Sequence, residues 1–404
     1  MAPCFHALEN QLLLCCARTE LNGAAKTRGQ QLIQKDLDWS YLLEAATAHG
    51  VGPLLYKSLC VIGQDLVPSA TQSWLRRHTQ QVFVHSNVMA EELLNVLAAF
   101  EAQDLPSIPF KGAVLAASAY GSLALRPFGD VDIWVHQKDI TRCKEILFSL
   151  GYCIGQPEKV RDEATYLRNH HDYLFFKQSK GNEINLELQW GVTEALFSFP
   201  IEFLPLWDRR ITMSLLGRAT PNLSVEDTLL ILCVHGAKHG WNKLMWICDI
   251  AELLRANSYI DWTWLIKHAE KLGGRRMLLL GLHLANTLLE TRLPEKVELQ
   301  VQADRTIRSL AQQVSEKLLR GAYEPSGILE EKPFLYMKVR EHWQHRLQVF
   351  FHYCPIYLTR MVTPNELDRA FLPLPNSLSL LYYIVRPLRL MSLYVRQSLG
   401  SSRR

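Results

Sequence analysis

The sequence lacks the cysteine patterns of a zinc site or of a disulfide scaffold. Its nine cysteines are an odd number, and no two of them form a Cys-x-x-Cys pair. Most of them lie among apolar residues, as reduced thiols in a protein core do. Cysteine usage therefore indicates a reducing compartment, and we expect a cytoplasmic protein.

Long hydrophobic runs and a large excess of one charge are missing too. No stretch approaches the ~18 uninterrupted apolar residues of a transmembrane helix, and the first residues have no basic segment of the kind that starts a signal peptide. Lys and Arg number 44 against 40 Asp and Glu, which gives a formal net charge of +4. This balance gives no strong nucleic-acid signal, because dedicated nucleic-acid binders usually carry a clear basic excess.

The chain does have the length and the apolar content for two or three folded domains. Of its 404 residues, 48% are hydrophobic and 21% are charged, close to the globular average. Apolar residues recur at helical spacing before about residue 100 and after about residue 215, whereas strand and helix patterns alternate between them. The sequence therefore predicts an α+β fold, with a small mixed β-sheet core over 83–215 between helical regions over 1–82 and 216–404.

The middle segment divides into elements by its residue pattern. β-Branched and aromatic residues predict strands, and glycines mark turns. The predicted order is a strand over 108–110, a turn at Lys111-Gly112, a helix over 113–120, a strand over 130–135, a helix over 138–150, and a hairpin of strands over 173–178 and 183–190. A single long helix is expected over 229–254.

Two aspartates at the start of the strand over 130–135 are the sharpest chemical feature. Side chains two residues apart on a strand point the same way, so Asp130 and Asp132 project side by side. Neighbouring carboxylates repel each other unless a cation lies between them, and Mg²⁺ takes hard oxygen ligands together with substrate phosphates. The pair is therefore a candidate Mg²⁺ site, although such pairs also occur as solvated strand starts.

Three further positions strengthen this interpretation. Lys111-Gly112 follows the preceding strand, where a bare glycine backbone can approach a phosphate. Arg126 comes just before the acidic pair, and Glu187 lies on the polar face of a later strand, where a third carboxylate would be needed. Each has a plain alternative, because Lys111 and Arg126 can be surface charges paired with carboxylates and Glu187 can be a solvated strand residue.

The chain resembles a known family through several separate motifs. They are Phe110-Lys111-Gly112-Ala113, Tyr120, Arg126-Pro127-Phe128-Gly129-Asp130-Val131-Asp132-Ile133, Gly151-Tyr152, Leu186-Glu187-Leu188-Gln189-Trp190, His235-Gly236-Ala237-Lys238-His239-Gly240-Trp241 with Asp249, Pro364 to Asp368, Leu372-Pro373, and Tyr382-Tyr383 to Arg386-Pro387. By these residues it resembles the uncharacterised nucleotidyltransferases of the DNA polymerase β-like superfamily. The resemblance runs through most of the chain and is most specific over 110–152.

The resemblance implies a role for each of these positions. In the superfamily the first two carboxylates hold metal ions, and the third completes the site and helps to activate the acceptor. Residue by residue, these are Asp130, Asp132 and Glu187. Lys111-Gly112 matches the turn under the phosphates, where the superfamily more often has Gly-Ser, and Gln189 stands where the family commonly has His.

The segment over 229–254 adds basic side chains. His235 and His239 are four residues apart and share one face of a helix, with Lys238 beside them. Three hypotheses stand: contact of Lys238 and His239 with phosphate or acceptor, a zinc site, and ordinary helix packing. The glutamate of an HExxH zinc motif is absent, since Gly236 follows His235.

The last part of the sequence mixes basic and apolar character. Residues 334–404 contain ten Lys or Arg and three Asp or Glu, a local net charge of +7, and they are rich in Leu, Tyr and Phe. We expect a helical domain that covers the catalytic cleft. The alternative is a peripheral contact of this basic tail with a membrane surface.

Together these observations predict a Mg²⁺-dependent nucleotidyltransferase that moves a nucleoside monophosphate from an NTP to an acceptor hydroxyl. The predicted catalytic and metal-ligating residues are Asp130, Asp132 and Glu187. The predicted nucleotide-binding residues are Lys111, Gly112, Arg126, Lys238 and His239. The alternative is a catalytically weak nucleotide-binding or interaction protein that keeps the fold. The sequence names neither the NTP nor the acceptor, which can be a saccharide, a metabolite, a peptide or an RNA end.

Overall fold

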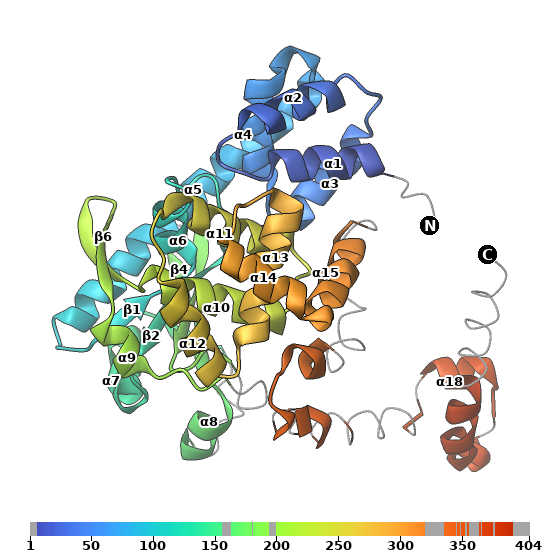
Figure 1. The fold of residues 1–404 in the computed structure, drawn as a ribbon. Helices are drawn as coiled ribbons and strands as arrows, with labels where there is room; N and C mark the ends of the chain where they lie inside the picture. Colours follow the sequence, from blue (N-terminus) through green and yellow to red (C-terminus); the bar gives the residue numbers. More distant parts are fainter. Residues whose placement is uncertain are drawn as a thin grey trace. The chain divides into compact units, whose positions relative to one another are not determined.

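A computed structural model describes most of the chain. The described residues are 6–155, 163–179, 181–193, 199–319, 335–344, 346–347, 349–351, 354, 363–364, 366–374 and 376–390. The chain divides into two compact units, residues 1–342 and 343–404. Each unit is described by itself below (Figure 1).

Helices make up the first hundred residues, as the sequence predicts. They are α1 (Ala7–Cys16), α2 (Gly23–Leu32), α3 (Trp39–Ala48), α4 (Gly52–Ile62), the 3-10 turn η1 (Gln64–Leu66) and α5 (Ser69–Glu101). The side chains of Asn22 and Asp38 cap α2 and α3 by accepting backbone N–H groups. Helix α5 has 33 residues and is continuous across the expected boundary between 82 and 83.

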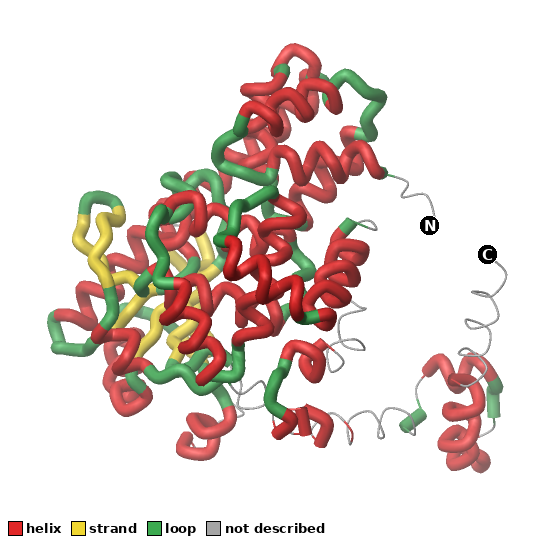
Figure 2. Tube along the Cα trace, in the orientation of Figure 1, coloured by secondary structure: helices red, strands yellow, loops and turns green. Residues whose placement is uncertain are grey.

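The middle of the chain forms a five-stranded mixed sheet. Its strands are β1 (Ser107–Pro109), β2 (Asp130–Val135), β3 (Cys153–Ile154), β4 (Asp172–Ser179) and β5 (Asn182–Gln189), in the spatial order β1-β2-β5-β4-β3. Strands β2 and β5 are parallel and the other pairs are antiparallel. The helical elements between the strands are α6 (Gly112–Ser118), η2 (Gln137–Asp139), α7 (Ile140–Ser149) and α8 (Glu163–Asn169). The predicted mixed sheet and α+β class are therefore confirmed (Figure 2).

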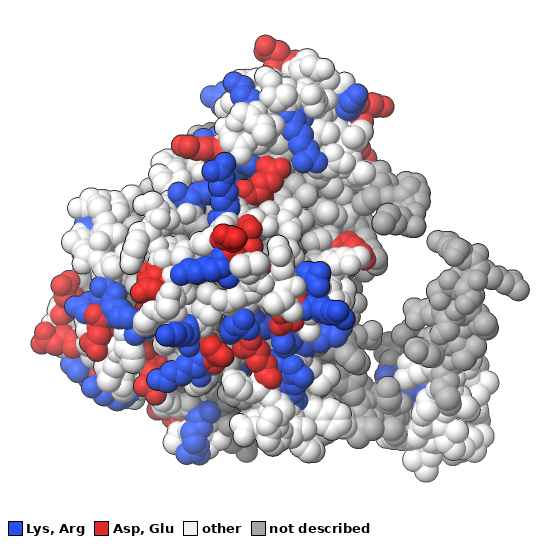
Figure 3. Space-filling view, viewed as in Figure 1, with Lys and Arg blue, Asp and Glu red and all other residues white. Residues whose placement is uncertain are grey.

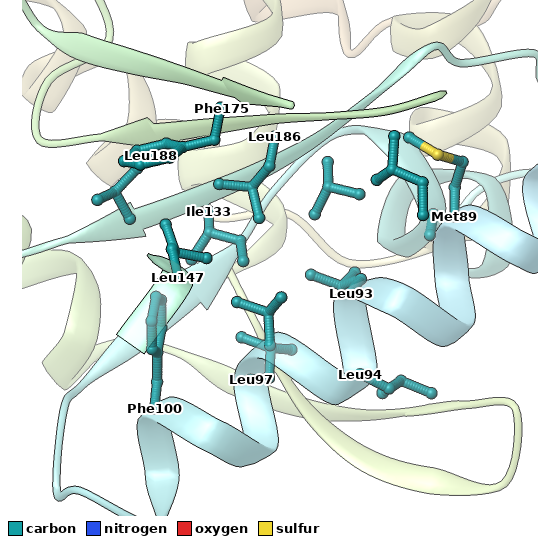
Figure 4. Close-up of a cluster of buried hydrophobic side chains, with 14 of the residues drawn as sticks. Met89, Leu93, Leu94, Leu97, Phe100, Ile133, Leu147, Phe175, Leu186 and Leu188 are labelled. Atoms are coloured by element: carbon teal, nitrogen blue, oxygen red, sulfur yellow. The ribbon is translucent and has the colours of Figure 1, made fainter. Parts of the chain in front are cut away.

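One face of the sheet is the core of this region. Leu186 and Leu188 of β5 and Ile133 of β2 are fully buried and pack against Leu93 and Leu97 of α5 (Figure 4). Burying each such side chain contributes roughly 1.5–3 kcal/mol to folding. Because strand side chains alternate, the polar residues between these apolar ones must face the other side of the sheet. That other side is where the acidic residues lie.

A second, two-stranded sheet follows α9 (Phe203–Asp208) and was not predicted. Its strands β6 (Ile211–Leu215) and β7 (Arg218–Asn222) are joined by Leu216 and Gly217, both of which have positive φ. Along β6, Ile211, Met213 and Leu215 alternate with polar residues, but only Leu215 is buried. This alternation is a signal for a strand that the prediction did not use. The expected boundary between 215 and 216 falls in the turn of this hairpin.

The rest of the first unit is helical. It contains α10 (Val225–Lys238), α11 (Leu244–Ala256), α12 (Trp262–Lys271), α13 (Arg275–Leu289), α14 (Glu295–Ala303) and α15 (Arg305–Leu318). The prediction of one helix over 229–254 is wrong, because Gly240 and Trp241 take positive φ and end α10. The buried ring of Trp241 folds back onto Gly236, where a Cβ atom would stand only 2.3 Å from it. Glycine at 236 is therefore required by packing.

The described residues of the second unit include α18 (Glu366–Phe371) and the 3-10 segment η5 (Asn376–Leu381). Inside this unit the buried Asp368 accepts hydrogen bonds from Arg386 and Arg389, at 2.8 and 2.6 Å. Much of the basic tail lies outside the described residues, so its role over the cleft and its contact with a membrane stay predictions. Among the helices that the structure describes, none combines the length and the apolar character needed to cross a membrane.

Candidate active site

Three carboxylates from two neighbouring strands meet on the polar face of the large sheet. Strand β2 pairs Asp132 with Glu187 of β5, and Asp130 precedes Asp132 by two residues on the same side. Each of the three offers a ligand oxygen, and these oxygens all lie within 4.8 Å of one another. The structure thus brings together the residues that the sequence singled out from segments 57 positions apart. We call Asp130, Asp132 and Glu187 the carboxylate triad.

The carboxylate triad carries more negative charge than its surroundings offset. The pKa of Asp132 is raised to about 8, chiefly by burial, and the charges of Asp130 and Glu187 add to the rise. The cation of Lys111 opposes it. Burial and then the charge of Asp130 also raise the pKa of Glu187. Carboxylates with raised pKa values favour the binding of a cation, because the cation offsets the repulsion between their charges.

Gln189 holds two members of the carboxylate triad. Its amide Nε2 donates to Asp132 Oδ1 at 2.8 Å and to Glu187 Oε2 at 2.7 Å. The side chain is only 3% exposed, so this amide has little access to water as a substitute partner. The site thus has at this position an amide that orients the carboxylates and does not titrate.

Lys111 lies beside the carboxylate triad at the turn between β1 and α6. Its Nζ is 3.6 Å from Asp132 Oδ1 and 4.8 Å from the centre of the Phe110 ring. Both Lys111 and Gly112 have positive φ, which glycine tolerates and lysine adopts at a cost of roughly 1–3 kcal/mol. The same turn lines a small pocket together with Phe128 and Asp130. The strained turn therefore holds an ammonium group and an open backbone next to the carboxylates.

Arg126 has a partner of its own. Its Nε and Nη2 donate to the two carboxylate oxygens of Asp249 in α11, at 2.7 and 2.9 Å. The guanidinium is buried, and its charge still acts on Asp130 and Asp132. Its geometry supports an ion pair inside the protein more directly than the predicted contact with a phosphate.

Lys238 ends α10 close to Glu187. Its Nζ is 3.2 Å from His171 Nε2, and its charge opposes the raised pKa of Glu187. The pKa of His171 is lowered to about 3, first by burial and then by Lys238 and Lys111, so the ring is neutral and can accept from the ammonium. Its Nδ1 lies 3.4 Å from Oδ1 of Asp172. The end of α10 thus brings a second cation to the site.

His235 and His239 pack together next to this cation. Their ring centres are 4.6 Å apart, and both lie about 5 Å from the ring of Trp246. Burial lowers the pKa of His235 well below its ordinary value. Within the described part of the chain, the carboxylate triad is the one group of three His, Cys, Asp or Glu side chains that could hold a metal ion. These contacts favour helix packing for His235 over the zinc hypothesis.

The donor set fits a hard divalent cation. Mg²⁺ prefers oxygen ligands and is usually bound by one or two carboxylates together with substrate phosphates. The carboxylate triad supplies only oxygens, and burial together with the neighbouring carboxylate charges raises the pKa of Asp132 and of Glu187. Asp130, Asp132 and Glu187 could therefore hold Mg²⁺.

Several contacts of the site were not predicted from the sequence, although Asp249 belongs to one of the family motifs. His171 and Asp172 stand at the start of β4, and the antiparallel register places Asp172 opposite Gln189. Asp249 is 123 positions away from the arginine that it binds. The pattern gave no signal for these contacts, because each depends on how strands and helices from distant segments pair.

Comparison with known proteins agrees with the geometry. No curated protein and no solved structure matches the chain. One family profile, described as uncharacterised nucleotidyltransferase, matches residues 35–290, a span that contains the whole sheet and helices α10 and α11. Since this match covers more than half of its length, the chain belongs to that family of nucleotidyltransferases.

Proposed function

We propose that the protein is a Mg²⁺-dependent enzyme that transfers a nucleoside monophosphate from an NTP to an acceptor hydroxyl. The bond that forms joins the acceptor oxygen to the α-phosphorus, and the bond that breaks joins that phosphorus to the oxygen bridging to the β-phosphate. Pyrophosphate leaves, and the hydroxyl loses its proton. The observation that carries this proposal is the carboxylate triad, with Asp132 buried and Asp130 and Glu187 half-buried, beside the Lys111-Gly112 turn.

The roles of the triad follow from its charges. Asp130, Asp132 and Glu187 would hold Mg²⁺, which would supply positive charge to offset the charge that develops on the leaving pyrophosphate. Asp130 and Asp132 supply metal ligands from β2. Glu187 lies on the neighbouring strand, opposite Asp132, where it would share a metal ion and help to orient or deprotonate the acceptor hydroxyl.

Two lysines mark where the phosphates would bind. Lys111 lies beside Asp132, and Lys238 acts on Glu187, so each cation is close to a different member of the triad. We propose that both contact the triphosphate, with the Gly112 backbone beneath it. His239 follows Lys238 at the end of α10 and is proposed as a further contact. Arg126 acts here through its charge on the triad.

The acceptor is the open part of the proposal. On the face drawn in Figure 3, acidic and basic side chains of the described residues are interspersed. Such a surface gives no specific support to a long polyanion, and a saccharide or a small metabolite is the acceptor class that we would test first. A cytoplasmic location, where NTP and Mg²⁺ are supplied, completes this proposal.

The test is transfer of label from each α-labelled NTP. The protein is incubated with one NTP at a time, Mg²⁺ and fractionated cell extract, and both pyrophosphate and the labelled product are measured. We expect one NTP and one fraction to give both, and Asp132→Asn or a metal chelator to abolish both. NTP binding without pyrophosphate release would favour the catalytically weak binding protein, and neither binding nor release would overturn the proposal.

A further inference from the structure

One buried carboxylate fastens two segments that lead into the site. Asp249 in α11 is fully buried and accepts three hydrogen bonds, two from Arg126 and one from the hydroxyl of Tyr120 at 2.7 Å. Both partners are only 5% exposed. Three buried polar groups thus satisfy one another at a point where helix α11 meets the sheet region.

Tyr120 and Arg126 belong to two different segments of the chain that lead to the carboxylate triad. Tyr120 comes directly after α6, the helix that begins at Gly112 next to Lys111. Arg126 lies in the loop that runs into β2, four residues before Asp130. Asp249 therefore connects both the helix that begins at the Lys111-Gly112 turn and the loop that leads into Asp130 to one position on α11.

The ion pair between Asp249 and Arg126 matters because the guanidinium of Arg126 is charged and buried. A buried guanidinium that loses its partner is strongly unfavourable and will seek another carboxylate. Asp130 and Asp132 are the carboxylates on which Arg126 already acts. If either were captured by Arg126, an oxygen needed for a cation would be occupied.

We propose that Asp249 is a positioning residue that keeps Arg126 away from the metal-binding carboxylates and holds the two approach segments in place. This inference rests on the proposed function of the triad. Asp249 touches neither metal nor nucleotide in this scheme, and it acts only through Arg126 and Tyr120.

The chain contains a matched control for this role. Asp227 in α10 is also fully buried, accepts a two-pronged contact from Arg209 at 3.0 and 2.8 Å, and accepts the hydroxyl of Ser224 at 2.7 Å. It stands 11 residues before Lys238 on the same helix, which is about 16 Å at 1.5 Å per residue. Asp227 thus reproduces the chemistry of Asp249 away from the triad.

The experiment compares Asp249→Asn with Asp227→Asn in the full chain. Melting temperature is measured without ligand, Mn²⁺ binding by paramagnetic resonance, Mg²⁺–NTP binding by calorimetry, and kcat and KM by pyrophosphate release. We expect both variants to lower the melting temperature. Only Asp249→Asn should weaken Mn²⁺ and Mg²⁺–NTP binding by about tenfold or more, which is ~1.4 kcal/mol or more.

A second substitution tests the mechanism directly. In the double variant Arg126→Gln with Asp249→Asn, no guanidinium remains to capture Asp130, so Mn²⁺ binding should recover relative to Asp249→Asn alone. A merely structural role predicts no such recovery. If Asp249→Asn does not fold, the double variant is compared instead with a second double variant, which combines Arg209→Gln and Asp227→Asn. The Tyr120→Phe variant then tests the hydrogen bond that connects Asp249 to the segment after α6. Mn²⁺ binding in the double variant should then match that of its control, and Tyr120→Phe should raise KM.

Failure of this inference is distinct from failure of the proposed function. Equal Mn²⁺ binding in Asp249→Asn and Asp227→Asn, or a double variant that binds no better than Asp249→Asn, would overturn the positioning role even if the wild-type protein transfers nucleotide. Where the single variant does not fold, a double variant that binds Mn²⁺ worse than its control, or a Tyr120→Phe variant with wild-type KM, overturns it. Normal Mn²⁺ binding with no transfer to any acceptor would overturn the proposed function and leave the Mn²⁺ comparison valid.

Discussion

The protein contains two kinds of carboxylate that are wholly or partly buried, and they are partnered in opposite ways. Asp249 and Asp227 are fully buried, whereas in the carboxylate triad Asp132 is buried and Asp130 and Glu187 are half-buried. Asp249 and Asp227 each face an arginine fork and a hydroxyl group. The members of the carboxylate triad face one another, with the amide of Gln189 and the ammonium groups of Lys111 and Lys238 nearby. Burial alone therefore does not mark a functional site in this fold. The incomplete compensation of charge distinguishes the triad, because a group of carboxylates without enough positive charge around it favours the binding of an exchangeable cation.

The largest expected effect comes from Asp130→Asn and Asp132→Asn. Each keeps the shape of the side chain but removes an anionic ligand and relieves repulsion within the triad. Activity should fall by several factors of ten, each factor being ~1.4 kcal/mol of lost transition-state stabilisation, while stability without metal stays equal or rises slightly. Pyrophosphate release and thermal melts measure the two quantities.

The same melts, repeated with Mg²⁺ and NTP, supply the control. A ligand that binds only the folded protein stabilises it by about 2.7 kcal/mol at a hundred times its dissociation constant. That rise should appear in the wild-type protein and shrink sharply in both variants. An equal rise in all three proteins would exclude the metal assignment.

Asp227→Asn should show the reverse behaviour. Asp227 is buried but Arg209 is 32% exposed, so water partly replaces the lost counter-charge, and we expect a loss of about 2 kcal/mol in the free energy of unfolding. Activity per folded molecule should stay at the wild-type level. Denaturant unfolding measures the stability, and active-site titration measures the activity per folded molecule. A lower kcat in fully folded Asp227→Asn would contradict the distinction between the two kinds of carboxylate.

Lys238→Ala and His239→Ala should have an intermediate effect. Neither residue is a proposed metal ligand, so we expect a higher KM for NTP or a lower kcat, by up to about tenfold, without unfolding. Lys271→Ala is the matched control, since this exposed lysine ends α12. Wild-type kinetics in the first two variants would assign these residues to helix packing.

At neutral pH the smallest effect concerns a buried histidine, because its contribution appears only as the pH falls. His49 accepts the backbone N–H of Leu244, and burial lowers its pKa to about 4. The unfolded chain binds a proton near pH 6.5 and the folded chain only near pH 4, so stability is lost as the pH falls through this window. His49 alone should contribute a slope of at most ~1.4 kcal/mol per pH unit.

His49→Gln isolates this contribution, because glutamine does not titrate and can still accept the Leu244 N–H. Unfolding free energy measured between pH 4 and 7 should fall less steeply in the variant than in the wild-type protein. Parallel curves would show that another group is responsible for the acid sensitivity.

How far the sequence predicts the structure depends on the range of the interactions. Strand β2 was predicted at its observed bounds because its pattern is local, and the family motif carried the pairing of Asp132 with Glu187. The break after α10 was missed because it depends on the Trp241 ring packing onto Gly236. The ion pair of Arg126 with Asp249 was not predicted, because Asp249 lies on a helix 123 residues away and a charged residue gives no sign of its partner. The contact of Arg126 with phosphate stays a prediction.

Helix α5 sets a limit on how the chain can be divided in the laboratory. Its first half packs against α4, and its second half forms part of the floor under the sheet through residues such as Met89 and Phe100. At 33 residues α5 is about 50 Å long, and it belongs both to the N-terminal helices and to the sheet region. A recombinant fragment that starts at residue 83 would cut this helix in the middle, so a fragment that contains the sheet should begin upstream of Ser69.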